Sequence, residues 1–173
     1  DTTQSVVMYP EKMAWQTSPT SSVSRKRFYL DGLAESGKVT SLVRYVSGAQ
    51  FPAHEHPDGE EILVLEGVFS DATGDYSAGS YLLNPEGFVH APFSKPGCLL
   101  FVKLRQYQGQ EHLAINLNEN YHERRVLCAT ANSTTYIVNL DKNSLVQIDN
   151  QHGLEGFVIS GCVSLDKGIR AQE

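Results

Sequence analysis

The sequence predicts an all-β fold, and three observations support this class. Short runs rich in Val, Ile, Leu and aromatic residues recur from residue 38 onward. Turn-forming residues separate these runs, as at Pro57-Asp58-Gly59 and Pro85-Glu86-Gly87, and this alternation is typical of an antiparallel sandwich or barrel. No stretch keeps a sustained helical apolar period, although residues 111–115 permit a weak helical turn.

Four strands are expected in order along the chain. The first covers residues 39–46 (VTSLVRYV) and ends at a Ser-Gly pair. The second covers residues 61–70 (EILVLEGVFS) and starts shortly after a Pro-Asp-Gly turn. The third covers residues 80–85 (SYLLNP), and the fourth covers residues 98–107 (CLLFVKLRQY), directly after a Pro-Gly pair. Each run has the length and composition of a β-strand.

Length and charge limit the class of protein. With 173 residues, of which 40% are hydrophobic and 20% charged, the chain suits one compact domain, or one domain and a partial second. A formal net charge of −6 argues against nucleic-acid binding, which usually needs a basic surface. We interpret the one basic run, Arg25-Lys26-Arg27, as a solvated strand edge. No apolar run approaches the roughly 20 residues that span a bilayer, so no membrane association is expected.

The three cysteines, Cys98, Cys128 and Cys162, are widely spaced and lie in or beside apolar stretches. They form no CxxC motif and their number is odd, so we interpret them as small buried residues of a reducing compartment. A cytoplasmic location is therefore expected, and the cysteines are poor candidates for zinc ligands.

An internal similarity appears when the chain is compared with itself at an offset of 94 residues. Residues 59–67 (GEEILVLEG) then fall on residues 153–161 (GLEGFVISG), and Leu42-Val43 falls on Tyr136-Ile137. Two copies of one β unit explain this match, and chance similarity between strand-turn-strand segments is the alternative. We expect residues 1–107 to form a metal-binding domain and residues 108–173 to form a degenerate second repeat packed on it.

The segment HEHPDGEE, residues 54–61, predicts a metal site. Side chains two residues apart share one face of a strand, so His54 and His56 point to the same side. Glu60 rejoins them after the Pro-Asp-Gly turn, and His90 completes the set if its strand lies alongside. Three imidazoles and a carboxylate suit a divalent transition metal. By alternation Glu61 faces away, in a structural role, and the remaining histidines, His112, His122 and His152, are also interpreted as structural.

The spacing of these residues resembles the two motifs of the cupin superfamily. The first motif, G-x5-H-x-H-x3-E-x6-G, matches from Gly48 to Gly67, and the second, G-x5-P-x-G-x2-H-x3-N, matches from Gly79 except that Ser94 replaces the final Asn. Residues 41–106 are more narrowly similar to the ChrR-like cupin domain. The resemblance implies a cupin (RmlC-like) β-barrel or jelly roll.

The resemblance also implies one bound divalent metal, held by His54, His56, Glu60 and His90. Zn or Fe(II) is favoured, and Mn or Ni is compatible with the same ligands. In the second repeat Ile148, Asn150 and Leu154 take the places of the first two histidines and the glutamate. That repeat is therefore not expected to bind metal.

Three functions are compatible with such a site. The ChrR-like family includes anti-sigma factor domains and proteins similar to an acetylacetone-cleaving dioxygenase, which implies either a small-molecule dioxygenase or a metal-dependent sensor without catalysis. A third alternative is a purely structural zinc site, since four protein ligands can close a tetrahedral site. Residues 1–40 contain no His or Cys, so sigma-factor binding through an N-terminal zinc module is not expected.

Other expectations concern the pocket and the assembly. Candidate pocket residues are Tyr45, Phe88, Phe101 and Lys103, although Leu100, Val102 and Leu104 form the more apolar face, which would turn Lys103 and Arg105 toward solvent. No residue stands out as a general acid or base. A homodimer is expected if the second repeat pairs with its equivalent in another subunit.

Overall fold

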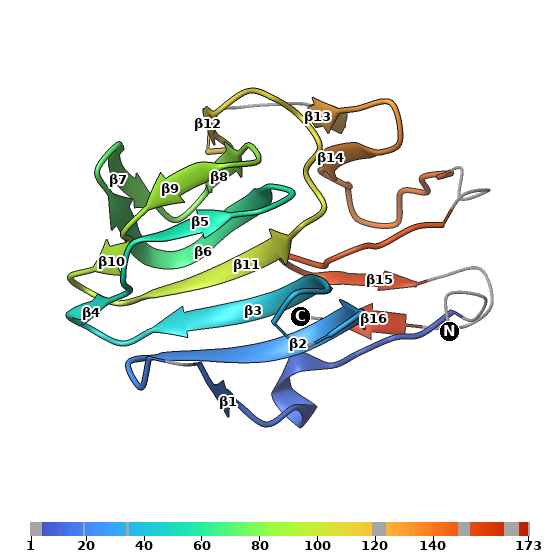
Figure 1. Ribbon diagram of the computed structural model, residues 1–173. Helices are drawn as coiled ribbons and strands as arrows, with labels where there is room; N and C mark the ends of the chain where they lie inside the picture. Colours follow the sequence, from blue (N-terminus) through green and yellow to red (C-terminus); the bar gives the residue numbers. More distant parts are fainter. Residues whose placement is uncertain are drawn as a thin grey trace. The chain divides into compact units, whose positions relative to one another are not determined.

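The structure is a computed structural model that describes residues 5–18, 20–33, 35–118, 124–148, 153–164 and 170–172. It confirms the all-β prediction, because the described segments form antiparallel strands and one 3-10 turn at Pro10–Lys12. The chain divides into two compact units, Trp15–Asn139 and the combination of Asp1–Ala14 with Leu140–Glu173. Figure 1 shows the strands of both units. No described helix is long and apolar enough to cross a membrane.

The larger unit is built on a sheet whose strands pair in the order β1-β2-β3-β11-β6-β10-β4. Their bounds are β1 Gln16–Thr17, β2 Val23–Asp31, β3 Lys38–Tyr45, β11 Cys98–Leu104, β6 Glu60–Asp71, β10 Phe93–Ser94 and β4 Ala49–Gln50. β7 (Gly74–Ser77) and β8 (Ser80–Asn84) also pair with β6, and β12 (Leu113–Asn116) pairs with β8. The four predicted strands correspond to β3, β6, β8 and β11.

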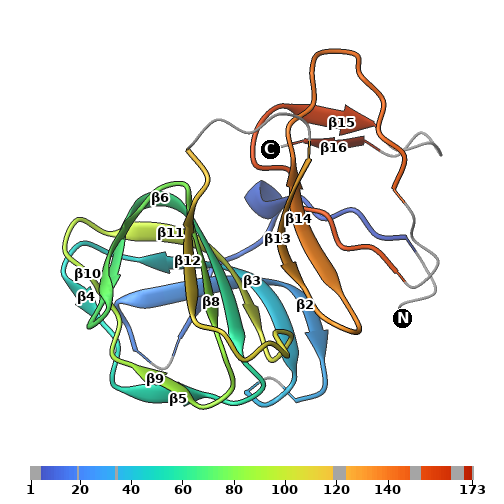
Figure 2. The same ribbon diagram turned by 90° about the horizontal axis from the view of Figure 1, so that it is seen from above.

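A second, two-stranded sheet consists of β5 (His54–His56) and β9 (Phe88–His90). Figure 2 shows this pair on the side of the unit opposite β11. The strands therefore surround a common interior, and the inward side chains of β3, β6 and β11 fill part of it. Leu100 lies opposite Val43 and Val64, and Val102 lies opposite Ser41 and Ile62.

Alternation along the fourth predicted strand, β11, predicts that Leu100 and Val102 face the interior, and both belong to the interior core. Leu100 and Val102 are 2% and 5% exposed and pack with Ile62, Val64 and Phe69. A smaller core lies on the outer side of β8 and is closed by the hairpin of β13 (Arg124–Ala129) and β14 (Thr134–Val138). Glu61 is buried there and accepts hydrogen bonds from the Tyr81 and Thr135 hydroxyls, at 2.5 and 3.2 Å.

Two local predictions were wrong. Residues 111–115 form no helical turn, because residues 113–116 are β12 and pair with β8. The basic run is not a solvated edge, since β2 is hydrogen-bonded to both β1 and β3. Lys26 is only 8% exposed and its ammonium lies 4.6 Å from the centroid of the Trp15 ring. The side chains of Arg25 and Arg27 are only 17% and 18% exposed.

The smaller unit contains the 3-10 turn and the antiparallel pair β15 (Cys162–Ser164) and β16 (Arg170–Gln172). At the offset of 94 residues, β14 falls on β3, whereas the counterpart of the first half of β6, residues 153–161, is not in a strand. The duplication and its boundary at residue 107 therefore stay predictions. Asn150, His122 and His152 lie outside the described residues.

We predict that Gly67→Ala lowers the free energy of unfolding by more than about 2 kcal/mol. Gly67 has φ +73°, and a Cβ atom there would lie 2.0 Å from the Gly97 carbonyl oxygen across the β6–β11 pair. The matched control is Gly48→Ala, because Gly48 has φ +75° but no atom within 4 Å of the added Cβ. Urea unfolding should show a loss near 1 kcal/mol for the control, and equal losses in the two variants would contradict the steric explanation.

Candidate metal centre

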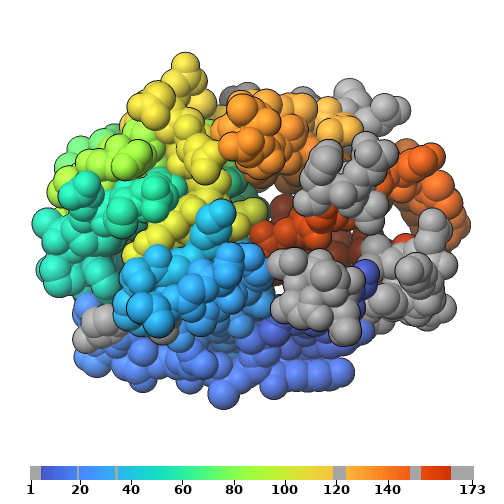
Figure 3. All heavy atoms as spheres, turned by 45° about the vertical axis from the view of Figure 1, so that its right-hand side comes forward, coloured from blue at the N-terminus to red at the C-terminus, as the bar shows by residue number. Residues whose placement is uncertain are grey.

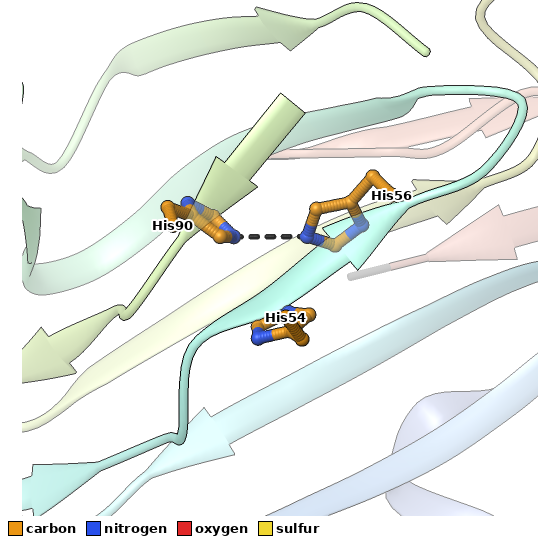
Figure 4. A group of neighbouring side chains, drawn as sticks. All are labelled: His54, His56 and His90. Carbon is orange, nitrogen blue, oxygen red and sulfur yellow. Dashed lines mark hydrogen bonds between the residues drawn. The ribbon is translucent and has the colours of Figure 1, made fainter. Parts of the chain in front are cut away.

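The β5–β9 pair brings three histidines together. His54 lies directly opposite His90 in the antiparallel register, and His56 is two residues along β5 on the same face. His56 and His90 are 6% and 5% exposed, and His54 is half-buried. Figure 4 shows the three imidazoles converging from the two strands. Their potential ligand nitrogens all lie within 4.8 Å of one another, as the sequence spacing predicts.

Hydrogen bonds orient the rings. His54 Nδ1 lies 2.8 Å from the Pro52 carbonyl oxygen, and His90 Nδ1 lies 3.0 Å from Asp71 Oδ2. In both residues the acceptor places the proton on Nδ1 and leaves the Nε2 lone pair available. His90 Nε2 is 2.9 Å from His56 Nε2 (Figure 4). The available nitrogens thus face the centre of the cluster.

Glu60 lies beside two of these histidines. Its Oε2 atom is 3.3 Å from His56 Nε2 and 3.7 Å from His90 Nε2, and it accepts a hydrogen bond from Asn84 Nδ2 at 2.9 Å. The turn before it is tight, because Asp58 and Gly59 both have positive φ, 59° and 75°. A Cβ at Gly59 would lie 2.3 Å from the Tyr107 carbonyl oxygen, so this position needs glycine.

Burial controls the charge of the cluster. Desolvation lowers the pKa of His56 to about 3, and the positive charges of His90, His54 and Arg105 act in the same direction. Desolvation also lowers the pKa of His54. For Glu60, burial raises the pKa to about 7 although His90 and Asn84 oppose the shift. At neutral pH the His54 and His56 imidazoles are therefore uncharged, the form that binds metal.

Two residues that support the cluster, Asp71 and Asn84, were not predicted from the sequence. Asp71, the last residue of β6, accepts the His90 hydrogen bond and bonds from Thr73. Burial raises the pKa of Asp71, but these hydrogen bonds outweigh it and lower the pKa to about 2. Asn84 holds Glu60, and its Oδ1 lies 3.0 Å from Nδ1 of His112. No spacing rule points to the Asp71–His90 and Asn84–Glu60 contacts, because each joins two different strands.

His112, predicted to be structural, is thus connected to the candidate ligands. Its ring stacks on Phe88 with 4.6 Å between centroids, and its Nδ1 atom positions the amide that holds Glu60. It does not belong to the group of three converging histidines.

A cavity of about 210 Å³ adjoins the cluster inside the larger unit. His54, His56, Glu60 and His90 line it, together with apolar residues of β3, β6 and β11. Of the predicted pocket residues only Tyr45 lines this cavity, while Phe101 stacks on Phe28 with 6.4 Å between centroids. Arg105, expected to face solvent, is also part of the lining.

Comparisons with known proteins agree with this fold. Residues 3–108 match the family described as the ChrR cupin-like domain. An RmlC-like cupin from Ralstonia eutropha JMP134 has 19% identity and a TM-score of 0.52, covering 68% of this chain and 76% of that one. An acetylacetone dioxygenase from Acinetobacter johnsonii has 13% identity and a TM-score of 0.48, covering 64% and 85%. No curated protein sequence matches.

The family's namesake is also among the similar structures. The Rhodobacter sphaeroides complex of SigE with the anti-sigma factor ChrR has 23% identity and a TM-score of 0.48. The match covers 56% of this chain and 51% of that chain, so the present chain spans about half the length of that relative. Together with the barrel and its three converging histidines, the family match over more than half of the sequence shows that this chain belongs to the ChrR cupin-like domain family.

Proposed function

We propose that the chain binds one divalent transition metal through His54, His56, Glu60 and His90, and acts through it on a small molecule in the barrel cavity. One observation carries this proposal: the cavity is lined by all four of these side chains. A ligand in the cavity would therefore meet the metal-binding atoms directly. A purely structural zinc site needs no such space, because its four ligands are closed around the ion.

The residues fit a divalent ion. The Nε2 atoms of His56 and His90 are 2.9 Å apart, close enough that one ion would be held by both. The carboxylate of Glu60 supplies negative charge beside them, and hydrogen bonds from His54 and His90 to neighbouring acceptors hold the imidazoles in the ligand tautomer. Imidazole and carboxylate ligands suit Fe(II), Zn, Mn and Ni.

The enzyme activity that we propose is oxidation of a small diketone-like or phenolic substrate by O2. A metal in this position would polarise a substrate oxygen or lower the pKa of a bound water molecule. The chain's own residues would exclude bulk water through the apolar walls of β3, β6 and β11. Tyr45 would remain a hydroxyl donor, because burial and the charge of Glu60 raise its pKa far above the usual range.

A regulatory module that responds to a metal or ligand is the second candidate, favoured by membership of a family named after ChrR, which is an anti-sigma factor in its complex with SigE. The homodimer and the cytoplasmic location stay predictions.

Removing support from His90 should weaken metal binding without unfolding the barrel. We predict that Asp71→Asn lowers divalent-metal affinity by roughly 10- to 100-fold, since a neutral amide replaces the carboxylate that accepts the Nδ1 proton. Asp75→Asn, an exposed acid of the following strand, is the matched control. Competition with a colorimetric chelator measures the affinities.

His54→Ala and His90→Ala should lose the metal, and unchanged metal content in both would contradict the assignment.

Metal binding should release a proton from Glu60. In the metal-free protein the pKa of this carboxyl is about 7, so near pH 6 it is mostly protonated and must ionise to bind a cation, whereas near pH 8.5 it is already ionised. We predict that at pH 6 the native protein releases more protons than Glu60→Gln, by up to about one, and that the difference shrinks as the pH rises to 8.5. Calorimetry in buffers of different ionisation enthalpy measures this release.

The matched control for proton release is Glu55→Gln, because Glu55 lies on β5 between His54 and His56 and is exposed. It should behave like the native protein at both pH values. Equal release by the native protein and Glu60→Gln at pH 6 would show that Glu60 is not a ligand.

Oxygen uptake distinguishes the enzyme from the regulatory module. After anaerobic reconstitution with Fe(II), we predict that the native protein consumes O2 in proportion to the loss of acetylacetone or dihydroxyacetophenone, and that His54→Ala does not. Mn, Ni and Zn are tested in parallel with an oxygen electrode. Absence of turnover with every metal, in protein shown to contain the metal, would favour the regulatory module.

A further inference from the structure

Two arginines lie on the inner face of the barrel. Val23, Arg25 and Arg27 alternate along β2, and Val23 belongs to the interior core with 3% exposure. Arg25 lies opposite Val43 and Arg27 lies opposite Ser41 in the β2–β3 register, and both partners line the cavity. The two guanidinium side chains therefore leave the sheet on the cavity side, which is uncommon for long charged residues.

The hydrogen-bonding capacity of these arginines is only partly used. Both approach Glu35 Oε1, through Nη2 atoms at 2.5 and 3.1 Å, and Arg27 Nη1 donates to Gln16 at 2.7 Å. The Nε atom of each is buried and has no hydrogen-bond partner among the described residues. A buried donor without an acceptor is costly, and it indicates an acceptor such as water or a ligand.

A third guanidinium is held at the same end of the cavity. Arg105 follows β11 with φ 61°, a backbone conformation that is uncommon for a residue with a side chain, and its N–H donates to the Gly59 carbonyl at 2.8 Å. Its guanidinium donates to the carbonyl oxygens of Glu35 and Gly37 at 2.7 and 3.1 Å. Arg105 thereby joins the β2–β3 connection to the turn before Glu60.

The three chain segments that Arg105 connects also lie together on the surface of the larger unit. In Figure 3 the light-blue connection between β2 and β3, the teal segment before β6 and the yellow segment after β11 meet on one face of the larger unit. The Glu35 carboxylate, which is 65% exposed, pairs with Arg25 and Arg27, whereas the Arg105 guanidinium donates to main-chain carbonyl oxygens. Of the other acids that line the cavity, Glu55 is exposed and Glu60 is a candidate ligand. Arg25 and Arg105 line the cavity and Arg27 does not, so an anion in the cavity would meet Arg25 beside the exposed Glu35.

The rest of the cavity limits the ligand's size and polarity. Ile62, Leu100, Val102 and Leu104 form an apolar wall between β6 and β11. A volume of about 210 Å³ is below the roughly 300–1,000 Å³ of drug-sized binding sites. A short apolar body with one anionic group has complementary size, polarity and charge.

We propose that the cavity binds a small organic monocarboxylate, with its carboxylate on Arg25 and its apolar body against Ile62, Leu100 and Val102. Arg27 and Arg105 add positive charge, and Glu35 occupies the arginines when no ligand is bound. This adds a carboxylate group to the small-molecule class proposed above for the same cavity and rests on that proposed function for its purpose. The anion contacts themselves need no metal, so binding is measurable in metal-free protein.

The experiment is calorimetric titration of hexanoate, with hexanamide as the neutral analogue, into the full chain with and without Zn. Native protein should bind hexanoate at least roughly 10-fold more tightly than hexanamide in both states. Arg25→Gln should weaken hexanoate binding by roughly 10- to 100-fold. The matched control is Arg44→Gln, since Arg44 is exposed on the adjacent strand and its guanidinium carbon lies 4.0 Å from the Trp15 ring centroid. It should bind like the native protein.

If Arg25→Gln failed to fold, its loss of binding would not be informative. A second variant is therefore needed, one that is expected to bind hexanoate more tightly. Glu35→Gln removes the competing carboxylate from an exposed position and should tighten hexanoate binding by roughly two- to five-fold. Equal binding of hexanoate and hexanamide, or equal effects of Arg25→Gln and Arg44→Gln, would overturn the proposal and leave a structural ion-pair cluster. Failure of Zn to bind, with hexanoate binding intact, would instead contradict the metal proposal alone.

Discussion

The antiparallel register of β5 against β9 is the constraint on which the site depends. It places His54 directly opposite His90, and the two-residue period of a strand then sets His56 on the same face. A shift by one residue would turn the histidines of one strand away from the interior. Gly59 lies in the turn between β5 and β6, where its left-handed backbone and close approach to the Tyr107 carbonyl admit no side chain. Glu60 reaches the histidines only through this turn.

The barrel interior combines two opposite electrostatic demands. At the histidine cluster, burial disfavours charge: it lowers the pKa of His56 and raises that of Glu60. The nearby Asp71 carboxylate is nevertheless held in its charged form by hydrogen bonds from His90 and Thr73. A divalent cation among the three imidazoles would compensate both carboxylates at once, so the polar groups of the site are consistent with a charge that the chain does not itself supply.

The same interior is asymmetric along its length. The histidines and Glu60 line the cavity at the candidate metal centre. Aliphatic side chains of β6 and β11 form a wall, and Arg25 and Arg105 also line the cavity. Apolar walls reduce screening, so a charge in this cavity interacts more strongly with the arginines than it would on the surface. The position of Arg105, between the turn before Glu60 and the loop that carries Glu35, connects these regions through the backbone.

The sequence by itself determined the all-β class, the strands β3, β6, β8 and β11 and the three histidines, because turn residues, strand composition and two-residue alternation are local properties. It also separated Glu60 from Glu61, since alternation assigns them to opposite faces. Only the tertiary structure decided that Asp71 and Asn84 support the cluster and that Arg25 faces the cavity. In an alternating run such as Arg25-Lys26-Arg27 either face can be the inner one, and the choice is made by pairing with β3, whose own inward face is set by long-range packing. Contacts between strands far apart in the chain leave no fixed spacing in the sequence.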